Sequence, residues 1–181
     1  MANDGILTGT EVRQKLLAGA VKLTDAVSCT LGPRGQNVIL YQKGAAPVIT
    51  KDGVTVARVV ELEDDFEQAG VEVLRQAALQ TNTVAGDGTT TATVLAKAIL
   101  EEANRQITAG AIPIEVKRGM DKAVEKIIDK LSEMSRPVSS EEEISHVATV
   151  SANGDEVIGK LIASAVAAAG KDGAITIEES R

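Results

Sequence analysis

Aromatic side chains are almost missing from this sequence of 181 residues, which has no tryptophan, one phenylalanine and one tyrosine. A core must therefore be built mainly from Ala, Val, Ile and Leu, a composition that suits closely packed helices. Proteins that bind single-stranded nucleic acid usually stack bases on aromatic side chains, so this composition argues against that function. Hydrophobic residues make up 44% and charged residues 25% of the chain, which is typical of a globular protein.

Cysteines, basic tracts and long apolar runs are also scarce. Cys29 is the only cysteine, so no internal disulfide can form, and we interpret it as a structural thiol compatible with a reducing compartment. The net charge is -7 and the basic residues are dispersed, which argues against binding to DNA or to an anionic membrane. Neither a signal-peptide pattern nor a run of roughly 20 apolar residues is present. We expect a cytoplasmic protein without nucleic-acid or membrane partners.

Helical periodicity is the main pattern that is present. Apolar residues recur at helical spacing in five stretches, which are 12–27, 66–78, 91–99, 116–131 and 157–169. A shorter helix is expected at 141–150, because Ser140 and Glu143 have the spacing of a capping box. The sole histidine, His146, falls in this helix and has no second histidine or cysteine near it in sequence, so we interpret it as a helix-face residue.

Short β-prone runs occur at three places. The runs at 38–41 and 47–50 flank Gly44 and predict a hairpin. Residues 51–53, Lys-Asp-Gly, then resemble an ordinary turn after a strand. The run at 174–177 predicts a further strand. Since strands must pair, we expect the chain to be the front part of a longer protein.

The segment 86–91, Gly-Asp-Gly-Thr-Thr-Thr, has the residue types of a phosphate site. Its glycines allow the backbone to approach an anion, and the following helix start offers free N–H groups and a positive dipole end. Asp87 would repel phosphate unless a cation such as magnesium bridged the two. The alternative is that Asp87 is simply an N-cap and the threonines are ordinary helix-start residues. The residues of this segment alone support both interpretations equally.

Other glycine-bearing turns are weaker signals when each is taken alone. The turn at 30–35 is interpreted as a plain helix stop, since it follows a helical stretch and contains Gly32 and Pro33. Asp52 has the chemistry to orient a water molecule, but nothing next to it in sequence demands that role. No Walker loop and no Gly-x-Gly-x-x-Gly pattern is present, which argues against the common nucleotide-binding folds.

Taken together, four segments resemble the N-terminal part of group I chaperonins of the GroEL type. The four segments are 30–37, 49–54, 85–94 and 151–153. Their order and separations match that family, and the segment 117–124 agrees with it as well. The resemblance runs over essentially the whole chain. It implies a mainly α fold, in which residues 1–136 form the first part of an equatorial ATP-binding domain, a helical bundle with a small β-hairpin. Residues 137–181 would form the ascending part of a small α/β intermediate domain that acts as a hinge.

The resemblance also implies a function, cofactors and partners. Chaperonins of this type are homo-oligomeric double rings that bind non-native client polypeptides and encapsulate them under a co-chaperonin lid in an ATP-driven cycle. The cofactors would be ATP, Mg²⁺ and K⁺. The hairpin at 37–51 would add strands to a sheet in the neighbouring subunit.

Site residues follow from the resemblance position by position. Asp87 would ligate magnesium, and Asp52 would position the attacking water, so these two are the catalytic candidates. Thr30 and Lys51 would place the potassium ion through their backbones and would also contact the nucleotide. The remaining nucleotide-binding positions would be Leu31, Gly32, Pro33, Gly86, Gly88, Thr89, Thr90, Thr91, Val150 and Ser151.

The chain also departs from the family pattern. It lacks counterparts of the apical domain, which binds clients and the lid, of the second half of the equatorial domain, and of the returning intermediate segment with its catalytic aspartate. Because phosphoryl transfer depends on positioning, we expect weak or no ATP hydrolysis by this chain alone. One alternative is a naturally short chaperonin-like protein that binds nucleotide or joins rings without folding clients. Another, an unrelated small ATPase or phosphotransferase, has only the Asp87 segment in its favour.

Overall fold

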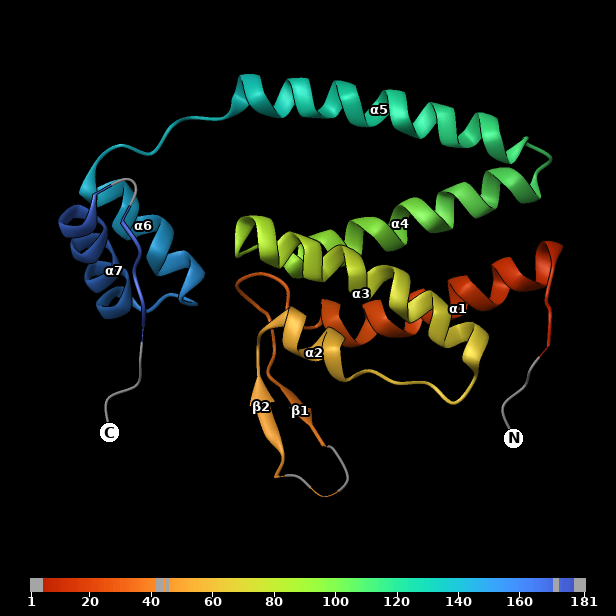
Figure 1. The fold of residues 1–181 in the computed structure, drawn as a ribbon, viewed down its shortest axis with the longest axis horizontal. Coiled ribbons are helices and arrows are strands. Elements are labelled where there is room, and N and C mark those ends of the chain that lie inside the picture. Colours follow the sequence, from red (N-terminus) through yellow and green to blue (C-terminus); the bar gives the residue numbers. More distant parts are fainter. Residues whose placement is uncertain (1–4, 42–43, 45, 171–172, 178–181) are drawn as a thin grey trace. The chain divides into compact units, whose positions relative to one another are not determined.

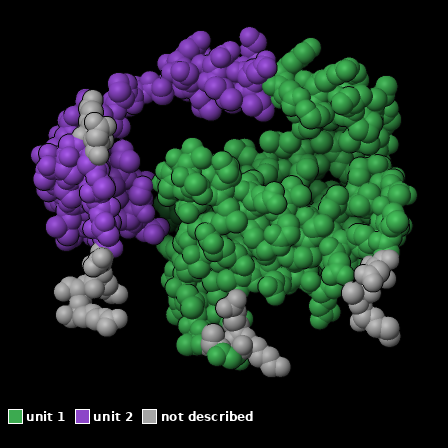
Figure 2. Space-filling view, viewed as in Figure 1, with its two compact units in different colours: residues 1–122 green, residues 123–181 purple. Residues whose placement is uncertain are grey.

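The computed structural model describes residues 5–41, 44, 46–170 and 173–177, and this part of the chain is mainly helical (Figure 1). It contains seven helices and one two-stranded antiparallel sheet, which confirms the predicted fold class. The chain divides into two compact units, Met1–Lys122 and Ala123–Arg181 (Figure 2). The division falls inside the continuous helix α5, Pro113–Met134, and the proposed domain boundary at 136/137 stays a prediction.

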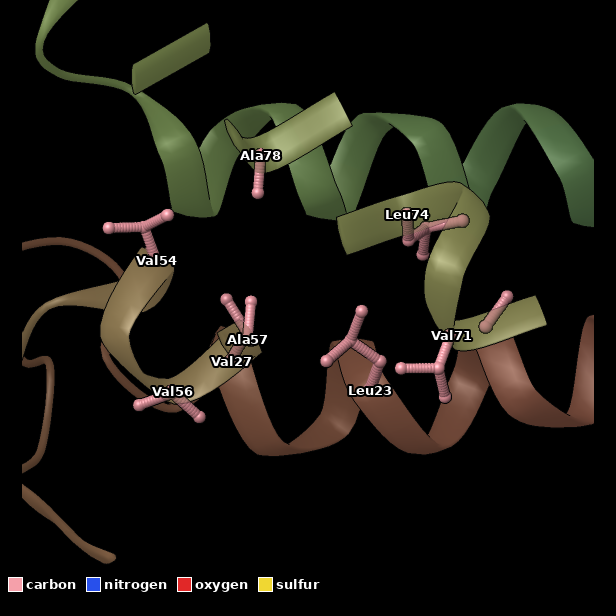
Figure 3. Packing of buried hydrophobic residues seen from close by; sticks show 9 residues of the cluster. Leu23, Val27, Val54, Val56, Ala57, Val71, Leu74 and Ala78 are labelled. Atoms are coloured by element: carbon pink, nitrogen blue, oxygen red, sulfur yellow. The ribbon is translucent and has the colours of Figure 1, made fainter. Parts of the chain in front are cut away.

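In the first unit the long helices α1 (Gly9–Ser28), α3 (Asp65–Ala85) and α4 (Thr89–Thr108) pack against one another. The short helix α2 (Gly53–Val59) packs against all three of these helices. Small aliphatic side chains from α1, α2 and α3 form the core, as expected from the lack of aromatics (Figure 3). The core residues are Ala20, Leu23, Val27, Val54, Val56, Ala57, Val71, Leu74 and Ala78.

The backbones of helices α1 and α3 are in close contact where each helix places a glycine. A Cβ atom at Gly19 would lie 1.8 Å from the carbonyl oxygen of Glu67, and one at Gly70 would lie 2.0 Å from that of Leu16. Neither position can carry a larger side chain without separating the helices. This close packing fixes the first half of α3 against α1.

The predicted hairpin is confirmed. Strands β1 (Val38–Leu40) and β2 (Val48–Thr50) pair in antiparallel register, with Ile39 opposite Ile49. The turn predicted at 51–53 is in fact the start of α2. Asp52 is its N-cap, and the side chain of Asp52 accepts hydrogen bonds from the N–H groups of Val54 and Thr55.

The second unit contains α6 (Glu141–Ser151) packed on α7 (Glu156–Ala169). The predicted capping box is present, because Ser140 and Glu143 bond reciprocally at the start of α6. His146 lies exposed on α6, as predicted. The strand predicted at 174–177 is wrong, since residues 173–177 form no strand. A strand requires a neighbour, and within the described residues β1 and β2 pair with each other.

None of the helices in the described residues combines the length and apolar character that a membrane span requires.

Candidate functional site

Three segments that are far apart in sequence meet at Thr90, in the first turn of α4. The Thr30 hydroxyl at the end of α1 lies 3.2 Å from the Thr90 hydroxyl. Gly53, at the start of α2, approaches so closely that a Cβ atom there would lie 2.1 Å from Thr90 Oγ1. The structure therefore brings together the three predicted segments around residues 30, 52 and 88.

The loop between α3 and α4 is shaped by two glycines in the left-handed conformation. Gly86 has φ 71° and ends α3, and its N–H donates to the Asn82 carbonyl. Gly88 has φ 81° and is the N-cap of α4, and no side chain of the described residues caps this helix. Such backbone angles favour glycine. The uncapped start of α4 leaves N–H groups and a positive dipole end, the features that bind phosphate.

Asp87 is an exposed carboxylate between these two glycines, and its Oδ1 accepts a hydrogen bond from the Gly88 N–H at 2.6 Å. The interpretation of Asp87 as the N-cap of α4 is wrong, because Gly88 occupies that position. Magnesium usually takes one or two carboxylates and completes its coordination with phosphate oxygens and water. An exposed carboxylate beside an uncapped helix start fits a magnesium–phosphate site.

The threonines at the start of α4 differ in what they can offer to a ligand. Thr30 donates its only hydroxyl proton to the Val27 carbonyl at 2.8 Å, so in the Thr30–Thr90 pair the hydroxyl of Thr90 is the donor. Thr89 is only 7% exposed, whereas Thr91 is exposed. In this arrangement Thr91 offers a hydroxyl group to a phosphate, and Thr90 offers its backbone N–H.

The turn after α1 is tightly closed. The N–H of Gly35 donates to the Gly32 carbonyl at 2.9 Å, and the N–H of Gln36 donates to the Cys29 carbonyl at 2.7 Å. Thr30 is buried beneath this turn, whereas Leu31, Gly32 and Pro33 are exposed. Exposed apolar groups beside the Thr30–Thr90 contact are suited to cover the non-phosphate part of a nucleotide.

Cys29 precedes this turn and is exposed, with its thiol 3.0 Å from the Ala26 carbonyl oxygen.

Asp52 is held in place by its capping role. Its carboxylate accepts from the Val54 N–H at 3.3 Å, from the Thr55 N–H at 3.0 Å, and from the Thr55 hydroxyl. The residue is exposed and precedes Gly53, which contacts Thr90. An exposed, fixed carboxylate next to a phosphate-type loop can orient a water molecule.

Three further predicted positions are not tested by this geometry. Val150 and Ser151 lie at the end of α6, in the second unit, and Val150 is 76% exposed. Their contact with a nucleotide stays a prediction. The same holds for Lys51, which is half-buried, as a potassium ligand together with Thr30.

Sequence reasoning missed α2 and, with it, the contact between Gly53 and Thr90. One signal was available, because aspartate is a preferred N-cap and Asp52 directly precedes the helix. Three of the next four residues, Val54, Thr55 and Val56, are β-branched and disfavour helix, so the pattern resembled the end of a strand.

Comparisons with known proteins identify the family to which the chain belongs. The family model described as the TCP-1/cpn60 chaperonin family matches residues 23–181. Among solved structures, the chain is similar to the chaperonin gp146 from bacteriophage EL 2 (Pseudomonas aeruginosa), crystallised in the presence of ATP-BeFx. One crystal form gives 28% identity and a TM-score of 0.73, with 91% of this chain and 29% of that chain covered.

A second crystal form of the same chaperonin gives 29% identity and a TM-score of 0.72 over 88% of this chain. In both cases this chain spans less than a third of the length of the protein it matches, 29% and 28%. The resemblance recognised in the four sequence segments is confirmed. With a family model that matches residues 23–181, this chain belongs to the TCP-1/cpn60 chaperonin family.

Proposed function

We propose that this chain supplies most of an ATP–magnesium site in an ATP-dependent chaperonin that assists protein folding. The observation that carries the proposal is the convergence of three chain segments, around residues 30, 53 and 88, on Thr90 at the uncapped start of α4. Helix starts with free N–H groups bind phosphate readily, and the glycines of this loop let the backbone approach it. The related phage chaperonin, crystallised in the presence of ATP-BeFx, supports a nucleotide as the ligand.

Within this site the two exposed carboxylates have different roles. Asp87 would hold a magnesium ion, and Asp52 would orient the attacking water. Thr30 and Lys51 would hold a potassium ion through their backbones. When bound, magnesium neutralises the charge that develops on the transferred phosphoryl group. ATPase activity belongs to the complete ring assembly, and this chain alone hydrolyses ATP weakly or not at all.

The partners of the complete protein would be further copies of itself in a cytoplasmic double ring, together with a co-chaperonin lid and non-native clients that bind through an apical domain without a counterpart in this chain. The hairpin supports the first of these. Ile39 is 68% exposed and Ile49 is 66% exposed, although both lie in paired strands. An exposed two-stranded sheet with apolar side chains is suited to pair with a strand of a neighbouring subunit.

The proposal is tested by calorimetric titration of this chain with ATP, with and without Mg²⁺. We predict that Asp87→Ala lowers the affinity for Mg-ATP by about tenfold or more, since it removes a metal ligand. The variant keeps its fold, because Asp87 is exposed and does not cap α4. Asp129→Ala, which removes an exposed aspartate on α5, is the matched control and leaves the affinity unchanged.

If Asp87→Ala and the parent chain bound Mg-ATP with equal affinity, Asp87 would not be a magnesium ligand. Failure of the parent chain to bind ATP at millimolar concentration, while it remains folded by circular dichroism, would overturn the proposed site as a whole.

A further inference from the structure

Arg75 of α3 holds the C-terminal end of α2. Its Nε donates to the carbonyl of Ala57 at 2.8 Å, and its Nη2 donates to the carbonyl of Val60. Ala57 is in the last turn of α2, and Val60 is its C-cap with an extended backbone. A helix end leaves its last carbonyls without partners inside the helix. The guanidinium of Arg75 donates to the carbonyl of Ala57 inside the helix and to the carbonyl of Val60 at its C-cap. The Arg75 side chain is only 15% exposed.

Two further side chains of α3 extend this contact. Glu72 Oε1 accepts from Arg75 Nη1 and from Gln68 Nε2, the latter at 2.8 Å. Gln68 Oε1 in turn accepts from the N–H of Leu62 at 2.9 Å. Gln68, Glu72 and Arg75 are spaced by four and three residues and so lie on one face of α3. We call these three residues the α3 clamp. Through Gln68 and Arg75 they bind three backbone groups at and after the end of α2, which are the carbonyls of Ala57 and Val60 and the N–H of Leu62.

Helix α2 depends on such contacts because it has only seven residues. Isolated helices shorter than about 12 residues are marginal in water. At its N-terminal end, Asp52 caps the helix and Gly53 lies against Thr90. The α3 clamp and the Asp52 cap therefore act on opposite ends of one short helix.

We infer that Arg75 is a positioning residue of the candidate nucleotide site, which fixes the carboxylate of Asp52 through α2. The effect on α2 is argued from the structure alone, whereas its consequence for ATP rests on the proposed function. Arginine suits this role because its donors form a rigid planar fork that spans two carbonyls. Lysine keeps the charge opposite Glu72 but concentrates its donors at one point.

The first test is amide hydrogen exchange, measured by NMR on the folded 181-residue chain. Arg75→Lys should speed exchange of the N–H groups of Val54, Thr55 and Val56 by about tenfold or more, since a charged hydrogen bond is lost at the other end of the helix. Arg58→Lys is the matched control, because Arg58 is exposed on α2 itself, and it should change exchange less than about twofold. Unchanged exchange in folded Arg75→Lys would overturn the inference.

A second variant covers the case in which Arg75→Lys fails to fold. Glu72→Gln removes the charge that orients the guanidinium but leaves Arg75 itself in place. It should speed exchange at the same three N–H groups by a smaller factor, with the exchange of α4 amides unchanged. Uniform acceleration throughout the first unit would show a general loss of stability, which would contradict a positioning role.

The second test measures the ratio of affinities for Mg-ATP and Mg-ADP. Asp52→Asn retains a good N-cap type but removes the charge beside the terminal phosphate, so it should raise this ratio by about fivefold. Arg75→Lys should raise the ratio in the same direction, and the double variant should equal Asp52→Asn alone. Full additivity of the two changes would show that Arg75 does not act through Asp52. If the parent chain binds no ATP, the proposed function fails, and hydrogen exchange still decides the effect on α2.

Discussion

Position 53 has no room for a side chain. A Cβ atom there would lie 2.1 Å from Thr90 Oγ1 and 3.2 Å from Val27 Cγ1. We predict that Gly53→Ala lowers the free energy of unfolding by about 1–3 kcal/mol, the usual cost of overpacking. The same variant should bind Mg-ATP more weakly, because α2 must move away from Thr90. Equilibrium unfolding in urea and calorimetric titration measure the two effects.

Gly119 in α5 provides the control for the same glycine-to-alanine change at a position with free space. A Cβ atom there meets nothing within 4 Å, and the residue is exposed inside a helix. Gly119→Ala should therefore raise stability by up to about 1 kcal/mol, from helix propensity alone. If Gly53→Ala were as stable as the parent chain, close packing would not be what keeps α2 against α4.

At the scale of elements, α1 and α3 are joined by ion pairs beside their close crossing. Lys15 Nζ lies 2.6 Å from Asp64 Oδ2 and 3.3 Å from Glu67 Oε1, and Lys22 also pairs with Glu67. The hydrogen bond from Lys15 lowers the pKa of Asp64 below its ordinary value of 3.8. The hydrogen bond from Lys22, followed by that from Lys15, lowers the pKa of Glu67 below 4.5.

These lowered pKa values predict acid sensitivity. As the pH falls, the unfolded chain takes up protons at these two carboxylates before the folded chain does. Their stabilising contribution is therefore present above about pH 4.5 and is lost as the pH falls through the folded pKa values. We expect Glu67→Gln to reduce the difference in unfolding free energy between about pH 7 and about pH 3.

Urea unfolding at the two pH values measures this difference. Glu125→Gln, which alters an exposed glutamate on α5, should leave the difference unchanged. The same pH dependence in Glu67→Gln and the parent chain would show that the α1–α3 ion pairs do not contribute.

The elements also differ in how far the sequence could predict them. Long helices such as α3 and α5 have enough turns for apolar periodicity to stand out, and local chemistry identified the hairpin and the Ser140 cap. Helix α2 has only seven residues, so its stability comes from Arg75 and from buried neighbours rather than from its own pattern. The Thr30–Thr90 contact joins residues 60 positions apart, and such tertiary contacts leave no periodic signal.

At the scale of the whole molecule, α5 is the most exposed amphipathic element. None of its 22 residues is buried. Its apolar side chains are also exposed, with Val124 at 50%, Ile127 at 56% and Leu131 at 59%. Together with Met120 and Met134 these residues are spaced alternately by four and three positions, which places them along one stripe of the helix. Exposed apolar stripes of this kind are interaction surfaces or aggregation sites. The exposed stripe is therefore open to other copies of this chain.

We therefore predict that the isolated chain self-associates through α5, and that Ile127→Asp combined with Leu131→Asp shifts it towards monomer in sedimentation velocity. The free energy of unfolding should change by less than about 0.5 kcal/mol, because neither side chain is buried. Ser132→Asp adds a negative charge beside the stripe without removing an apolar group, and should leave association unchanged. If the double variant associated as strongly as the parent chain, the contact between copies would lie outside α5. The exposed Ile39 and Ile49 of the hairpin would then be the next residues to alter.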